Sequence, residues 1–143
     1  MRSRAAIGLV LFCLFVGIFP AQAKEPEQIT VQHILIGFKN SVPKKPQERS
    51  KGEAKALAYD ILQRAQDGED FDALVEEYTN DNVPGIMILT NKGAPRVAGG
   101  RTRSELVPKF GDVAFRLEVG EVGMANFNTA NCPYGWHVIK RLE

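Results

Sequence analysis

The sequence has few of the residues from which catalytic sites are usually built. Its 143 residues include only two cysteines and two histidines. It contains no nucleophile elbow, phosphate-binding loop, dinucleotide fingerprint or H-E-x-x-H zinc motif. The histidines and cysteines are not spaced as a closed zinc site, so we predict no metal and no cofactor. The net charge of +1 gives no field that points to nucleic acid or to an acidic membrane.

The N-terminus has the pattern of a secretory signal peptide. Arg2 and Arg4 precede an apolar run from Ala5 to Phe19, and Ala21-Gln22-Ala23 ends in small residues that suit cleavage. The run is shorter than the roughly 20 residues that span a bilayer, although an uncleaved anchor is the alternative. We therefore predict that residues 1–23 are removed. The protein would then be periplasmic or extracellular, with no membrane attachment.

Cleavage would change both the charge and the thiol content. Removing Arg2 and Arg4 from the 18 basic residues leaves 16 against 17 acidic residues, a net charge of −1. Cys13 would also be lost, and Cys132 alone cannot form an internal disulfide. The mature domain is therefore expected to depend on its hydrophobic core.

Periodicity and capping signals predict a mixed α+β domain over residues 29–143, after a short flexible lead over 24–28. The run 29–38 is apolar on both faces, as in an interior strand. Ser50 and Glu53 form a capping box, and Asp70 caps a second helix. The expected elements are a strand over 29–38, helices over 50–68 and 70–78, a strand over 86–90, a helical piece over 106–115 and a strand pair over 122–127 and 136–142. Loops are expected over 39–49 and 91–103.

The two histidines lie in the first and last of these strands. If those strands are neighbours, His33 and His137 lie on one face a few ångströms apart. Each could instead be a core histidine satisfied by a backbone carbonyl. Burying two such rings is costly without partners, which favours a mutual hydrogen bond and a shared site. Cys132, five residues before His137, also suggests a thiol nucleophile, but no third group is in view to orient the pair.

Five segments in order resemble the parvulin family of peptidyl-prolyl cis-trans isomerases, across nearly the whole mature chain. They begin with the "HIL" motif at His33 and end with the "GxH" motif at His137. The five are His33-Ile34-Leu35-Ile36, residues 69–81, Glu105-Leu106-Val107-Pro108-Lys109-Phe110 with Phe115, Gly120-Glu121-Val122, and residues 134–140. The resemblance implies a four-stranded, mostly antiparallel sheet surrounded by helices, in the order β-α-α-β-α-β-β.

The resemblance also assigns roles to residues. It implies His33, Asp81 and His137 as catalytic residues, and Leu106, Phe110, Phe115 and Tyr134 as substrate-binding residues. An X-Pro bond rotates over a barrier of about 18–20 kcal/mol, and no bond has to break. Apolar walls would hold the proline, while Asp81 would disfavour the resonance form that puts negative charge on the carbonyl oxygen. Asp81 in an Asn-Asp-Asn turn could equally be a helix-ending residue.

The sequence departs from the family pattern at three places. Gly85-Ile86-Met87-Ile88-Leu89 replaces a Gly-Asp-Leu-Gly motif, so no pocket leucine can be assigned. The last hairpin has extra residues over 126–131, and Cys132 stands where a threonine often supports the first histidine. These changes predict an altered pocket rim and weak activity on small peptides. Lys44, Lys45 and Arg49 are expected to be solvated charges.

Three functions remain open from the sequence. The first is an exported isomerase acting on proline-containing unfolded or nascent polypeptides, as a monomer and without nucleic acid. The second is a non-catalytic peptide-binding module or holdase with the same pocket. The third is a hydrolase that uses Cys132.

Overall fold

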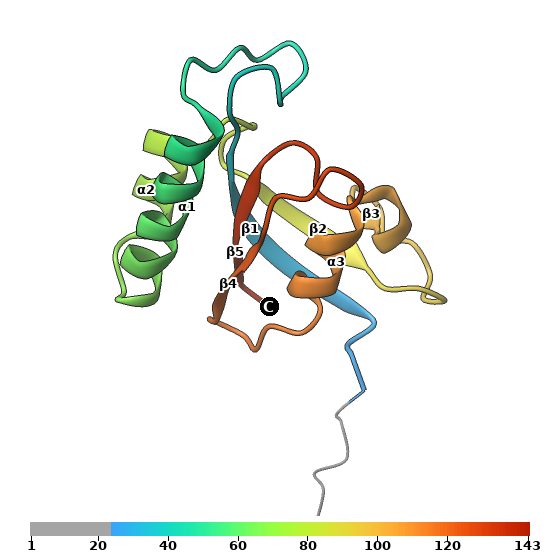
Figure 1. The fold of residues 1–143 in the computed structure, drawn as a ribbon. Coiled ribbons are helices and arrows are strands. Elements are labelled where there is room, and N and C mark those ends of the chain that lie inside the picture. The colour runs from blue at the N-terminus through green and yellow to red at the C-terminus, as the bar shows by residue number, and fades with distance from the viewer. Residues whose placement is uncertain (1–23) are drawn as a thin grey trace, which may run out of the picture.

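The computed structural model describes residues 24–143, so the predicted signal peptide over 1–23 lies outside the described residues. The fold is a five-stranded sheet with helices on both faces (Figure 1). The elements are β1 (Gln28–Ile36), α1 (Lys51–Gln66), α2 (Phe71–Tyr78), β2 (Ile86–Thr90), β3 (Arg101–Thr102), the 3-10 turn η1 (Arg103–Glu105), α3 (Pro108–Ala114), β4 (Val122–Ala125) and β5 (Trp136–Arg141).

Strand β1 is the centre of the sheet, whose order is β3-β2-β1-β5-β4. It pairs antiparallel with β2 along its first half and with β5 along its second half. Ile29, Val31, Ile34 and Ile36 are almost completely buried, on both faces of the strand. The prediction of an interior strand covered on both sides is therefore confirmed. The first and last strands, whose pairing the sequence left as a condition, are neighbours in the sheet.

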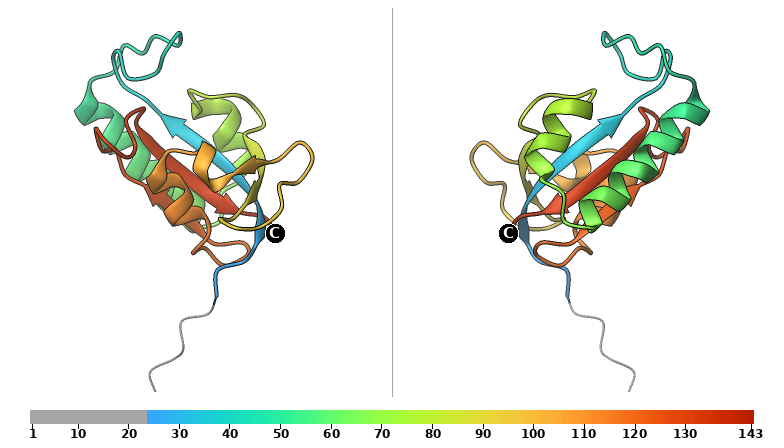
Figure 2. Two further views of the ribbon diagram at one scale, coloured as in Figure 1. Left: turned by 90° about the vertical axis from the view of Figure 1, so that its right-hand side faces the viewer. Right: turned by 90° about the vertical axis from the view of Figure 1, so that its left-hand side faces the viewer.

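Helices α1 and α2 cover one face of the sheet (Figure 2). Ser50 and Glu53 form both bonds of the capping box that starts α1, as predicted. The Asp70 side chain accepts a hydrogen bond from the Asp72 amide at the start of α2. The helices pack against Ile34 and Ile36 of β1 and against β5, and this is the larger core cluster.

Helix α3 covers the opposite face. Pro108 occupies its first turn, where a missing N–H costs nothing. Its buried side chains Phe110 and Ala114 pack against Ile29 and Val31 of β1 and Ile139 of β5. Because neighbouring residues of a strand point to opposite faces, His33 and His137 lie on this second face, above α3.

Two local expectations differ from the structure. Arg101 and Thr102 form a fifth strand, parallel to β2, in the segment expected to be a loop. A two-residue strand has no periodicity, so the sequence pattern could not predict it. The lead over 24–28 is also not loose, because Asn91 donates to the Pro26 carbonyl (3.0 Å) and Arg103 pairs with Glu25. Of the described helices, none has the length and apolarity needed to span a bilayer.

Candidate active site

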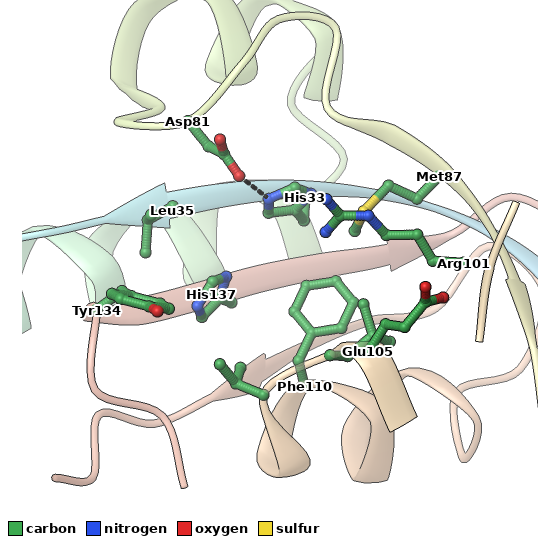
Figure 3. Close-up of a pocket in the computed structure, with 11 residues that line it drawn as sticks. His33, Leu35, Asp81, Met87, Arg101, Glu105, Phe110, Tyr134 and His137 are labelled. Atoms are coloured by element: carbon green, nitrogen blue, oxygen red, sulfur yellow. Dashed lines mark hydrogen bonds and ion pairs between the residues drawn. The ribbon is translucent and has the colours of Figure 1, made fainter. Parts of the chain in front are cut away.

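A cavity of about 280 Å³ opens on the α3 face of the sheet, over the middle of β1 and β5. Figure 3 shows His33, His137, Phe110 and Tyr134 around it, with Asp81 at one edge. The volume is close to the lower end of ligand pockets, which suits a small ring better than a large cofactor. The lining residues are His33, Leu35, Asp81, Met87, Arg101, Glu105, Leu106, Val107, Phe110, Tyr134 and His137.

His33 is fixed by hydrogen bonds at both ring nitrogens. Its Nδ1 lies 3.1 Å from the Gly85 carbonyl oxygen, and its Nε2 lies 3.1 Å from Asp81 Oδ2. The backbone N–H of His33 donates to the same Gly85 oxygen. Neither acceptor carries a hydrogen when Asp81 is ionised, so only the ring nitrogens can donate in these two contacts.

The segment after α2 places Asp81 next to this ring. Thr79 Oγ1 accepts from the Leu35 amide, and the Asn80 amide donates to the Leu35 carbonyl at 2.7 Å. Asn80 Oδ1 also accepts from the Gly37 amide. These bonds tie the segment to the end of β1 and direct the Asp81 side chain toward His33. The hydrogen bond from His33 is the main cause that lowers the pKa of Asp81 to about 2.

His137 lies beside His33, with 5.7 Å between the ring centroids. The predicted hydrogen bond between the rings is wrong. His33 is opposite Ile139, and His137 is opposite Leu35, so the histidines form a diagonal pair. Both nitrogens of His137 are buried and have no hydrogen-bond partner in the described part of the chain. Burial, and then the charge of His33, lower the pKa of His137 to about 3.

Phe110 forms the floor of the cavity. Its ring makes edge-to-face contacts with both histidines, each at 5.3 Å between centroids. Leu106 and Tyr134 also line the cavity, and Tyr134 is 39% exposed at its mouth. Phe115 does not line it. The placement of Phe115 as a pocket wall is corrected, because its fully buried ring lies in the core against the Arg103 guanidinium.

The profile of the PPIC-type PPIase domain matches residues 19–143. The chain belongs to the parvulin family. It is 36% identical over 122 residues to a protein named chaperone SurA of Pseudomonas syringae pv. tomato, covering 85% of this chain and 24% of that protein. It is 32% identical over 127 residues to a parvulin-like PPIase of Rickettsia bellii, covering 84% and 34%. The solution structure of TbPIN1 has a TM-score of 0.60 at 18% identity, covering 82% of this chain and 98% of that one.

These relatives support the fold class predicted from the motifs, an α+β parvulin fold. The chain spans about a quarter of the length of the SurA relatives and about a third of the Rickettsia protein. The activity, substrates and partners of those longer proteins are therefore not transferred directly to this parvulin.

The segment that departs from the family pattern completes the parvulin cavity. Met87 lies opposite Val31 on β1, which places it on the same face as His33. Met87 lines the cavity from β2, where no pocket leucine could be assigned from sequence. Arg101 and Glu105 also line the cavity and were missed as well. Glu105 accepts a hydrogen bond from the Thr102 amide as part of a capping box. The S/T-x-x-E pattern of such a box is present in the sequence from Thr102 to Glu105, so this signal could have placed Glu105.

Of the three loop residues expected to be solvated charges, Lys44, Lys45 and Arg49, two have structural partners. Lys45 Nζ lies 3.6 Å from Asp81 Oδ1 and 3.2 Å from Asn82 Oδ1. Arg49 donates to the Gly37 carbonyl and, at 2.7 Å, to Asn80 Oδ1. The expectation that these are only solvated charges is corrected for both. Lys45 and Arg49 instead support the segment that holds Asp81.

Cys132 has the properties of a core residue. It is fully buried, and its Sγ lies 3.4 Å from the Gly135 carbonyl oxygen. Burial raises the pKa of the thiol to about 11. Because a thiol nucleophile needs thiolate and access, these properties argue against the hydrolase hypothesis. Within residues 24–143, no cluster of three or more His, Cys, Asp or Glu side chains could hold a metal ion.

The buried, neutral His137 predicts acid sensitivity. Its folded pKa of about 3 lies below the ordinary 6.5, so between these values the unfolded chain binds more protons. Its contribution to the free energy of unfolding is then largest above pH 6.5 and falls as the pH decreases. Urea unfolding of His137→Gln should lack about 1.5 kcal/mol of the loss that the wild type shows between pH 6.5 and 5.0. Equal losses in both proteins would contradict the neutral assignment.

Proposed function

We propose that this parvulin domain is a peptidyl-prolyl cis-trans isomerase that accelerates X-Pro rotation in folding or secreted polypeptides. The observation that carries the proposal is the cavity itself. It joins an apolar floor of Phe110, Leu106 and Met87 to an ionised carboxylate, Asp81, held by His33. An apolar floor can hold a proline ring and exclude water. The carboxylate can bias the electronic structure of the bound amide without forming a bond.

The proposed catalysis is non-covalent. A planar amide places partial negative charge on its oxygen, whereas a twisted amide loses that resonance. A carboxylate near the oxygen raises the energy of the planar form more than that of the twisted form, which lowers the barrier. His33 acts as a positioning residue, because it bonds Asp81 and is itself fixed by Gly85. Leu106, Phe110 and Tyr134 are the proposed substrate-binding residues, with His137 completing the wall.

Exchange spectroscopy on blocked X-Pro tetrapeptides tests the proposal. We expect catalytic amounts of residues 24–143 to broaden or exchange the cis and trans proline signals, which interconvert in tens to hundreds of seconds uncatalysed. Ordinary peptides without proline serve as the binding control. If the peptides bind and their exchange rate is unchanged, the isomerase proposal is wrong.

That contrary result would favour a holdase, the alternative function. Two features support the holdase as an alternative function. The SurA relatives are named chaperones. Cys132, a buried thiol, stands where the family resemblance places a threonine, and neither ring nitrogen of His137 has a hydrogen-bond partner within residues 24–143. A binding module would use the same floor and would suppress aggregation of an unfolded chain without faster proline exchange.

We also propose that the protein is exported, on the pattern of residues 1–23. Expression of the full chain in a bacterium should yield a mature protein beginning at Lys24 outside the cytoplasm. Deletion of residues 1–23 should leave the domain in the cytoplasm. Intact-mass measurement on the fractions checks both results, and an exported chain that still begins at Met1 would favour the uncleaved anchor.

A further inference from the structure

A second cavity, of about 340 Å³, adjoins the first. The two share four lining residues, His33, Asp81, Met87 and Arg101, so together they form one elongated cleft. The second part is otherwise lined by residues 82–86. Two of its apolar side chains are unusually exposed, Val83 at 54% and Ile86 at 49%. A peptide whose proline occupies the first cavity must continue past its mouth, and this second cavity lies directly beside it.

Arg101 is a positively charged residue that lines both parts of this cleft. It projects from the edge strand β3, and Figure 3 shows its guanidinium directed across the cleft toward His33 and Met87. The carboxylates that line the cleft already have partners. Glu105 pairs with Arg96 at 3.0 Å, and Asp81 pairs with His33 and Lys45. In residues 24–143, Arg101 has no carboxylate within ion-pair distance and no side-chain hydrogen bond.

We propose that Arg101 selects X-Pro segments with an acidic side chain next to the proline. This inference rests on the proposed function and names the substrate class of that site. A glutamate-type side chain fits because its methylene stem can lie on Val83, Ile86 and Met87 while its carboxylate pairs with the guanidinium. Lys45 balances the charge of Asp81, and Arg96 balances the charge of Glu105. Arg101 therefore leaves the cleft with an unbalanced positive charge, which attracts an added carboxylate.

Blocked tetrapeptides that differ at one position test the inference. Glu, Gln or Lys is placed either before or after proline, and both the affinity by NMR titration and the exchange rate are measured. We expect Glu to be favoured over Gln by about three- to tenfold at one of the two positions at low salt, and Lys to be disfavoured. The preference should decrease at 1 M salt, because the pair is partly exposed.

Variants assign the preference to a residue. Arg101→Gln should make Glu and Gln peptides equivalent, and Arg101→Glu should favour Lys. Lys92→Glu makes the same change of charge on an exposed residue that lines neither cavity, and it should keep the wild-type preference. Lys45→Gln tests the neighbouring cation, since Lys45 lies 3.6 Å from Asp81. Amide NMR spectra establish that each variant is folded.

Three results overturn the inference. One is equal treatment of Glu and Gln by the wild type at both positions. Another is a preference that survives in Arg101→Gln or disappears only in Lys45→Gln. The third is an absence of peptide binding. The isomerase proposal is judged separately. An affinity preference that depends on Arg101, without faster exchange, would refute catalysis and retain the selectivity, whereas faster exchange without any charge preference would do the reverse.

Discussion

Replacing Asp81 with asparagine should lower kcat/KM for X-Pro exchange by about 10²-fold or more, the usual cost of removing one preorganised electrostatic group. Asparagine keeps the size of the side chain and an oxygen that can accept from His33, but it removes the negative charge. Peptide affinity should change little, because the apolar floor is untouched. The measurement is exchange spectroscopy with a parallel NMR titration of the same X-Pro peptide.

The low pKa of Asp81 also predicts how the activity depends on pH. Since the hydrogen bond from His33 holds that pKa near 2, the side chain stays ionised throughout the range in which the protein can be assayed. Wild-type activity should therefore not depend on Asp81 titration above about pH 4. Asp60→Asn is the matched control, because Asp60 is an exposed partner of Arg64 on α1, far from the cleft. Full activity in Asp81→Asn would leave Asp81 as only a turn residue.

Much of the fold could be predicted because its signals are local. The alternation in β1, the capping box at Ser50 and Glu53, and Pro108 in the first turn of α3 each act within a few residues. The interior position of β1 was also predictable, since a strand that is apolar on both faces must be covered on both. The short strand β3 was missed because its pairing with Leu89 depends on the loop between them and not on any repeat.

The site was harder to predict, because it depends on how distant segments meet. His33, Asp81 and His137 were predicted to share one site, and the structure brings their side chains together around one cavity. Their hydrogen bonds were not foreseen, since the strand register offsets the two histidines and Gly85 competes for His33. Arg101 was missed for the same reason as β3. Its position at the cleft follows from a parallel pairing that carries no sequence signal.

Phe115 shows a different limit of motif reasoning. It follows Phe110 by five residues, and five helical steps of about 100° turn a side chain well away from the first. Phe115 also caps the end of α3, so its ring enters the core beneath the sheet while Phe110 faces the histidines. A match to a family motif therefore identified a buried aromatic residue without showing which cavity it faces.

The two phenylalanines allow the pocket to be separated from the core. Both are almost completely buried, Phe110 at 2% and Phe115 at 1% exposure. Truncation of either ring to alanine should lower the free energy of unfolding by about 3–5 kcal/mol, the usual cost for a buried aromatic side chain. Urea unfolding measures this loss, and binding is then compared at a low temperature where NMR shows both variants folded.

Peptide affinity should distinguish the variants. Phe110→Ala removes the floor between the histidines and should weaken binding of X-Pro peptides at least about tenfold, since burying an aromatic contact is worth more than about 1.4 kcal/mol. Phe115→Ala should bind as the wild type does, because its ring lies outside the cavity. Leu106→Ala adds a third point, as it shortens a partly exposed wall with little expected loss of stability. Similar affinity losses in Phe110→Ala and Phe115→Ala would mean that the binding surface follows the integrity of the whole α3 face and not the floor that Phe110 provides.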